Sequence, residues 1–245
     1  VKTTNDGVVD LVHLRSLLSV KNHKTLVSLM FVNNEIGTIL DVEKVGVICK
    51  EYEALFHTDA VQAVGHFDIK LNALSVDFMA ASAHKFHGPK GIGFAYFKKG
   101  FGIQPLLFGG SQEKGARAGT EAVSLIVGME LALRQSMHHL KKDVLYLYKL
   151  KKKFVNHLQV ELPAVKFNGV SADLQKSTVT MVSVRLPKEL PLLLFQLDML
   201  GIYLSGGSAC QSGSNQGSHV LNCLLSEEES RFTSLRFSFS KFTQW

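Results

Sequence analysis

This 245-residue sequence has few cysteines, no long apolar runs and few clustered basic residues. Its cysteines, Cys49, Cys210 and Cys223, show no C-x-x-C spacing, which predicts neither a disulfide framework nor a zinc site. No apolar segment is long enough to cross a membrane, and no signal-peptide pattern opens the chain at Val1. We therefore expect a reducing, cytoplasmic setting without membrane contact.

The charge of the chain is mild, with a formal net value of +6. The basic residues are scattered apart from Lys151-Lys152-Lys153, and no aromatic residues are interleaved with them. Such a run is typical of a solvated helix face, so no direct nucleic-acid partner is expected. With 46% hydrophobic and 20% charged residues, the composition is that of a globular protein with a substantial core.

Apolar, β-rich runs alternate with helical patterns in the first half of the chain. Residues 25–32 predict a strand covered on both faces, and Asp41 is expected to cap a helix that buries Cys49. Further strands are expected at residues 55–58, 76–82 and 92–97. This alternation predicts an α/β fold with a mostly parallel sheet.

Polar residues stand where three of these apolar runs end, namely Asn34, Asp59 and Lys85. In a parallel α/β sheet the chemistry collects beyond the carboxyl ends of the strands. Lys85 leaves a buried strand into a Gly/Pro turn, where partial burial would lower its pKa and make the amine a nucleophile or Schiff-base former. The alternative is an ordinary solvated turn lysine.

A glycine-rich loop at residues 109–120 ends in Gly119-Thr120 and precedes an expected helix at 121–137. Backbone N–H groups and a hydroxyl at a helix start suit an anion such as phosphate, although a plain capped loop is equally compatible with this pattern. Another long helix, rich in lysine, is expected at residues 140–162.

The composition changes in the second half and predicts a smaller α/β domain, with a boundary near residue 138. We expect strands at residues 178–186, 202–204 and 234–240, and helices at 190–200 and 218–225. Cys223 is placed on the apolar face of the last helix, and Arg236 within the last strand. Cys210 lies in a Gly/Ser loop rather than on an apolar face, which favours a reactive thiol.

A Schiff-base lysine, a carboxylate and a phosphate-type loop are together what pyridoxal phosphate chemistry requires. The carboxylate keeps the pyridine nitrogen protonated, so that the ring can accept electrons from the α-carbon of the substrate. This combination predicts pyridoxal 5'-phosphate as the cofactor.

Several segments resemble the cysteine desulfurases, which are class V, fold-type I pyridoxal-phosphate enzymes. They are V-N-N-E-I-G at 32–37, H-T-D-A-V-Q at 57–62, S-A-H-K-F-H-G-P-K-G-I-G at 82–93, R-A-G-T-E at 117–121 and S-G-G-S-A-C-Q-S-G at 205–213. The last resembles the group with a long S-x-A-C loop rather than the group with a short R-x-G-H-x-C loop. The resemblance implies a cofactor-binding large domain at 1–138 and a small domain at 139–245 that carries the cysteine loop.

The resemblance implies that Lys85 forms the Schiff base with the cofactor and later moves the α-proton of the substrate. Asp59 would pair with the pyridinium nitrogen, and Gln62 would bind the phenolic oxygen. The phosphate would be held by Ser82, by His84 and by Thr120, the last of which reaches across from the second subunit of a homodimer. No metal site is expected, because His84 and His87 have no third ligand near them in the sequence.

The resemblance also assigns the substrate side of the site. Asn34 would lie near the cofactor oxygen and the substrate carboxylate, which Arg236 would bind through its planar fork. Cys210 would take the sulfur of L-cysteine as a persulfide, leaving L-alanine, and pass it to an acceptor such as an iron–sulfur scaffold protein or to thio-modification.

Ser111 and Gln211 depart from the family pattern without removing a chemical role. Compared with the family, the chain is expected to be a fragment that lacks an N-terminal phosphate loop, a histidine that stacks on the cofactor, and the final helix. Two alternatives stay open: a selenocysteine lyase, which uses the same residues on selenium, and a catalytically inactive scaffold of the same fold.

Overall fold

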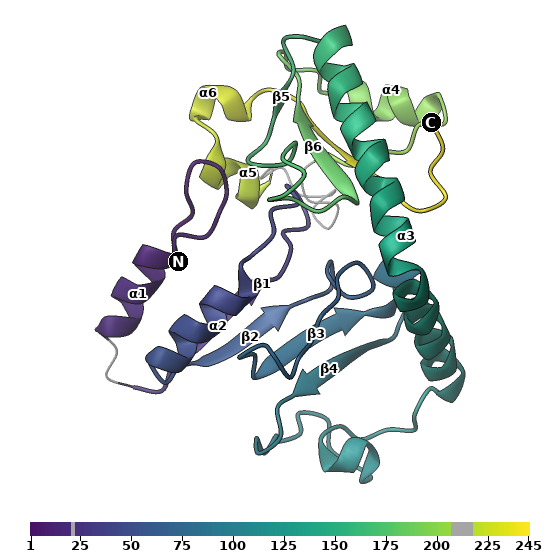
Figure 1. Cartoon of the computed structure of the whole chain (residues 1–245). Coiled ribbons are helices and arrows are strands. Elements are labelled where there is room, and N and C mark those ends of the chain that lie inside the picture. Colours follow the sequence, from purple (N-terminus) through teal and green to yellow (C-terminus); the bar gives the residue numbers. More distant parts are fainter. Residues whose placement is uncertain (21–22, 207–217) are drawn as a thin grey trace. The chain divides into compact units, whose positions relative to one another are not determined.

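The computed structural model describes residues 1–20, 23–206 and 218–245 (Figure 1). The chain forms two compact units. The large-sheet unit comprises residues 24–29 and 42–140, and the small-sheet unit comprises residues 1–23, 30–41 and 141–245. The domain boundary expected near residue 138 stays a prediction.

The large-sheet unit is built on strands in the order β1-β2-β3-β4 (Figure 1). These strands are β1 (Leu26–Met30), β2 (Leu55–Asp59), β3 (Phe78–Ser82) and β4 (Gly93–Phe97). β2 and β3 run parallel with Asp59 beside Ala80, whereas β3 and β4 run antiparallel. The carboxyl ends of β2 and β3 therefore meet at one edge of the sheet, as the α/β prediction required.

Asp77 ties this sheet together from the residue before β3. Its Oδ2 accepts from the Phe56 N–H of β2 at 2.9 Å, and its Oδ1 accepts from Lys98 Nζ, just after β4, at 3.1 Å. A buried carboxylate between two neighbouring strands satisfies a donor on each side and so favours this strand order.

β1 differs from the prediction of a strand covered on both faces. Its side chains alternate: Leu26 is 56% exposed whereas Val27 is buried. Leu26 and Ser28 share one face of β1 and are both exposed, so this face is open to solvent at the start of the strand. The predicted strand is correct, but its two-sided burial is wrong.

The helix after β1 matches its prediction. α2 (Val42–Glu51) buries one face through Val42, Val45, Ile48 and Cys49. Cys49 is 1% exposed, which confirms its predicted place in the core.

A single helix, α3 (Val123–Glu161), replaces the two helices predicted at 121–137 and 140–162. The residues around the expected break, Met-His-His-Leu-Lys at 137–141, include no glycine or proline. Without a residue that removes a backbone donor or favours a left-handed conformation, nothing local ends the helix there.

The small-sheet unit contains an antiparallel sheet in the order β5-β6-β7. Its strands are β5 (Lys166–Phe167), β6 (Met181–Arg185) and β7 (Ser234–Ser238). All five residues of β6 are buried. Val182 and Val184 form the core of this unit with Val155 of α3, and Phe154 and Phe237 pack against them. An isolated bridge joins Ser205 to Arg236, so the strand predicted at 202–204 is wrong.

The shorter helices of this unit are α1 (Leu11–Ser19), α4 (Leu193–Met199), α5 (His219–Leu224) and α6 (Glu227–Ser230). Asp10 caps α1, a helix not expected from the sequence, by accepting from the N–H groups of Val12 and His13. Cys223 of α5 is exposed, which corrects its expected place on an apolar face. No helix among the described residues is long and apolar enough to span a membrane.

Lys151 is fully buried on α3, so the solvated-face interpretation of the 151–153 run is wrong for this residue. Its Nζ donates to Ser177 Oγ and to the Thr178 carbonyl, both at 2.7 Å. Burial lowers the pKa of Lys151 from 10.5 to about 7, and the Asp173 carboxylate offsets part of that effect. The helix turns this lysine inward while Lys152 stays exposed.

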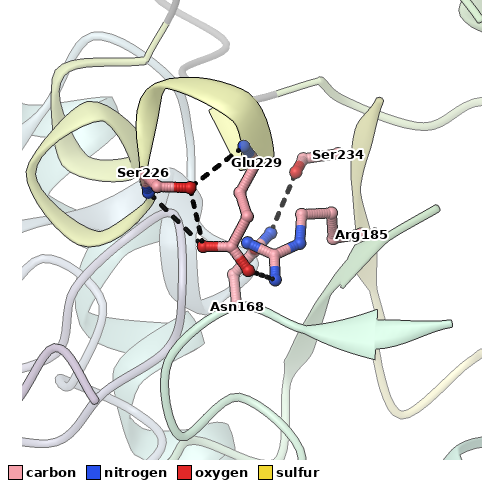
Figure 2. Close-up of polar contacts among 5 residues, drawn as sticks. All are labelled: Asn168, Arg185, Ser226, Glu229 and Ser234. Atoms are coloured by element: carbon pink, nitrogen blue, oxygen red, sulfur yellow. Dashed lines mark hydrogen bonds and ion pairs between the residues drawn. The ribbon is translucent and has the colours of Figure 1, made fainter. Parts of the chain in front are cut away.

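An ion pair ties β6 to α6 (Figure 2). Arg185 Nη2 donates to Glu229 Oε1 at 2.7 Å, and Glu229 also forms a capping box with Ser226 at the start of α6. Beside this pair, Asn168 Nδ2 donates to Ser234 of β7 at 3.1 Å. The backbone N–H of Ser226, followed by Arg185, lowers the pKa of Glu229.

We expect Lys151→Met to flatten the pH dependence of stability between pH 7 and 10.5. In this window the unfolded chain keeps the Lys151 proton that the folded chain has lost, so the free energy of unfolding of the wild type rises with pH. The difference in slope between the two proteins should approach, at most, about 1.4 kcal/mol per pH unit, measured by urea unfolding. Equal slopes in both proteins would contradict the burial of Lys151. The control is Lys152→Met.

Glu229→Gln is expected to lower stability at neutral pH and to remove part of the acid sensitivity. Because the folded-state pKa of Glu229 is depressed, its contribution is present above the ordinary carboxyl pKa and is lost as the pH falls through the lowered value. Thermal unfolding at neutral and acidic pH measures this. The neighbouring exposed Glu228→Gln should behave like the wild type, and a matching loss in both variants would argue against the pairing with Arg185.

Candidate functional site

Asp59 and Gln62 lie in the turn that follows β2. Asp59 Oδ1 accepts from the Val61 N–H at 2.9 Å, and the Ala60 N–H donates to the Ala80 carbonyl of β3 at 2.9 Å. The Asp59 side chain thus closes its own turn, a common role for aspartate after a strand. Both Asp59 and Gln62 are half-buried at the carboxyl edge of the sheet.

Lys85 lies in the short helix η1 (Ala83–Phe86), which directly follows β3. At the end of β3, Ser82 Oγ and His84 Nδ1 are hydrogen-bonded at 2.8 Å. The parallel pairing of β2 with β3 places these residues at the same edge as Asp59. The expected partial burial of Lys85 is wrong for this chain, because its side chain is exposed.

The chemistry of this group fits pyridoxal 5'-phosphate. A hydroxyl and an imidazole, Ser82 and His84, are suited to phosphate oxygens. Asp59 offers a carboxylate to a protonated ring nitrogen, and Lys85 offers an accessible primary amine to an aldehyde. The residues predicted from the sequence for the cofactor are therefore of the right types at one edge of the sheet.

Within the described residues, Thr120 forms no hydrogen bond with Asp59, Ser82, His84 or Lys85. It is exposed, between η2 (Gln112–Gly115) and the start of α3. Within η2, Glu113 and Lys114 adopt positive φ angles of 48° and 56°. Thr120 stays a predicted phosphate ligand of the second subunit.

Arg236 and Asn34, the two predicted substrate residues, contact each other in the small-sheet unit. Arg236 Nη1 donates to the Asn34 carbonyl at 2.8 Å, and Nη2 donates to Ser205 Oγ at 3.1 Å. Each terminal guanidinium nitrogen carries two N–H groups, so a second one remains on each nitrogen. The Arg236 fork is thereby oriented and can still bind a carboxylate.

Glu35 lies next to Asn34 and is 2% exposed. Its carboxylate accepts a hydrogen bond from Ser218, whose hydroxyl also caps α5 by accepting from the Leu221 N–H at 3.0 Å. Ser205 and Ser218 therefore anchor the described chain on either side of residues 207–217. Cys210, the predicted persulfide carrier, lies outside the described residues.

Sequence reasoning did not assign site roles to Ser205, Glu35 or Ser218. One local signal was available: a serine directly before the apolar positions of a short helix is a helix cap, and Ser218 is one. The partners of Ser205 and Glu35 are 31 and 183 residues away in sequence, beyond the reach of any local pattern.

Known proteins resemble this chain along almost its whole length. A cysteine desulfurase IscS of Clostridium botulinum is 40% identical over 234 residues, which are 95% of this chain and 58% of that protein. The solved NifS-like protein from Rickettsia africae has a TM-score of 0.90 at 32% identity and confirms the predicted fold, covering 100% of this chain and 64% of that one. The solved structure of SspA in complex with cysteine has a TM-score of 0.80 at 28% identity, covering 100% and 66%.

The chain thus spans 58% of the length of its bacterial relative. The sequence pattern of the family described as "Aminotransferase class-V" matches residues 1–244. The motifs, the sheet edge that bears them and the matched relatives agree, and the protein belongs to the aminotransferase class-V family.

Proposed function

We propose that the protein is a pyridoxal-phosphate-dependent cysteine desulfurase, which converts L-cysteine to L-alanine and holds the sulfur as a persulfide on Cys210. The observation that carries this proposal is the edge of the large sheet, where Asp59 follows β2 and Ser82, His84 and Lys85 follow the parallel β3. The name of the Clostridium botulinum relative and the cysteine in the SspA complex support it.

Ser82, His84, Asp59, Gln62 and Lys85 would hold the cofactor. When bound, pyridoxal 5'-phosphate supplies an electron sink for the α-carbon of an amino acid. Lys85 Nζ, exposed at the end of β3, would take and return the α-proton as a general base. Asp59 Oδ1 accepts from the Val61 N–H of its own turn, whereas Oδ2 forms no hydrogen bond within the described residues. Oδ2 would therefore accept from the pyridinium N–H of the cofactor.

Arg236 would bind the substrate carboxylate. Contacts with Asn34 and Ser205 hold its guanidinium before a substrate arrives, which reduces the entropy that binding must offset. The planar fork matches the two oxygens of a carboxylate, and an ammonium group would not.

Cys210 would accept the sulfur. In the net reaction the C–S bond of L-cysteine breaks and an S–S bond to Cys210 forms, giving alanine and a persulfide with no external oxidant or reductant. A thiolate is the reactive form of cysteine in such an exchange. The persulfide would then pass to a sulfur-acceptor protein, in iron–sulfur cluster assembly or in thio-modification.

The remaining predictions concern the whole protein. The proposal includes a homodimer in which Thr120 completes the phosphate site of the partner. It also includes a cytoplasmic location and a division at residue 138 between a cofactor-binding domain and a small domain. The names of the relatives favour sulfur over selenium chemistry.

Lys85→Ala should abolish the visible absorbance of cofactor-loaded full-length protein and lower alanine formation from cysteine. The loss should be on the order of 10²- to 10⁴-fold, the usual contribution of a positioned general base. Lys99→Ala, a change at another exposed lysine of the large-sheet unit, is the control. Cys210→Ser should keep the absorbance and lose persulfide formation. An unchanged absorbance band in Lys85→Ala would refute the proposal, and persulfide formation in Cys210→Ser would refute the role of Cys210.

Arg236→Lys should raise the KM for cysteine with a smaller effect on kcat. The substitution keeps the positive charge but removes the planar guanidinium that would bind both oxygens of the substrate carboxylate. A fall in kcat/KM of roughly 10- to 100-fold is expected for one charged hydrogen-bonding group. Arg231→Lys, an exposed arginine that pairs with Glu227, serves as the matched control. Wild-type kinetics in Arg236→Lys would exclude this arginine from carboxylate binding.

A further inference from the structure

The short helix η1, which carries Lys85, is a single turn of four residues. The N–H groups of His87 and Gly88 both point back to the Ala83 carbonyl, the latter at 2.8 Å, and His87 takes a left-handed conformation with φ 66°. The turn therefore stops at Phe86, and the carbonyls of Lys85 and Phe86 receive no bond from within it. Both carbonyls can accept from donors elsewhere in the chain. The Phe86 carbonyl is buried, where a missing partner would cost free energy, whereas the Lys85 carbonyl is exposed.

Two side chains from distant parts of the sequence supply those donors. His66 Nε2 lies 3.0 Å from the Lys85 carbonyl, and since a carbonyl can only accept, the His66 ring donates. Ser136 Oγ on α3 donates to the Phe86 carbonyl at 3.3 Å. Ser136 is 7% exposed and Phe86 is fully buried, so this second contact is shielded from water.

The backbone around the turn is packed too closely to shift freely. Gly65, next to His66, has φ +81°, and a Cβ there would lie 2.5 Å from Phe86 Cβ. On the other side, a Cβ at Gly128 of α3 would lie 2.8 Å from Pro89 Cγ. Glycine at both positions lets the 61–67 turn and α3 approach residues 86–89 closely enough for His66 and Ser136 to reach.

We propose that His66 and Ser136 are positioning residues for Lys85. They hold the two consecutive carbonyls that end its turn and thereby set the direction in which the Lys85 side chain leaves the backbone. This inference rests on the proposed role of Lys85 and adds two residues outside the segments that resemble the cysteine desulfurases. Neither His66 nor Ser136 touches the cofactor or substrate in this role; both act through the backbone of the turn.

The two hydrogen bonds can be removed without disturbing the apolar packing around the turn. His66 is half-buried and Ser136 has a small side chain, so removing either donor leaves the Phe86 core in place. One hydrogen bond of ordinary strength changes an opening equilibrium by about 5-fold. A displacement of the reacting amine is costly, because a small error in the position of a catalytic group lowers the rate disproportionately.

The test uses the full-length protein with Ser136→Ala and His66→Leu. Hydrogen exchange of the His87 and Gly88 amides, followed without cofactor, should quicken by roughly 5-fold in each variant. Reductive trapping of pyridoxal 5'-phosphate with cyanoborohydride, read by mass spectrometry at Lys85 relative to Lys99, should slow by a similar factor. The conservative variants Ser136→Thr and His66→Gln keep a donor and should restore both measurements.

Ser124→Ala on the exposed start of α3 and His138→Leu are the matched controls, and both should behave like the wild type. Unchanged exchange and unchanged Lys85 labelling in Ser136→Ala and His66→Leu would overturn the inference. So would faster exchange with undiminished labelling, since the turn would then loosen without affecting Lys85. If wild-type Lys85 is not labelled at all, the proposed function fails. The hydrogen-exchange measurement then still tests whether His66 and Ser136 stabilise the turn.

Discussion

The parallel pairing of β2 with β3 is the constraint on which the candidate cofactor site depends. It places Asp59 beside Ala80, so the turn after β2 and the turn after β3 leave the sheet at the same edge. The Asp77 carboxylate supports this order by binding Phe56 of β2 and Lys98 beyond β4. Without that register, Asp59 and Lys85 would be two polar residues in unrelated loops.

The small-sheet unit orients its functional side chain by a different means. β7 carries Arg236, and the strand is held on one side by β6 and by partly buried polar bonds such as Asn168 to Ser234. The guanidinium is then fixed by a backbone carbonyl and a hydroxyl. Hydrogen bonds define a geometry more narrowly than apolar packing does, because each bond requires a direction.

Several features were predictable because their causes are local. The strands ending near Asp59 and Ser82, the amphipathic α2 with buried Cys49, and the types of residue needed for pyridoxal phosphate follow from short-range patterns. The errors have tertiary causes. Lys151 lies in a lysine run that is usually solvated, yet the contacts of its Nζ with Ser177 and Thr178 allow it to be buried.

The sequence by itself determined the family motifs, the alternation of strands and helices, and the identity of the reactive groups, because these depend on residue type and on spacing along the chain. The tertiary structure decided which distant groups meet. Ser136 reaches Phe86 across 50 residues and Arg236 reaches Asn34 across 202. Such contacts depend on how whole elements pack, and residue spacing carries no record of that packing.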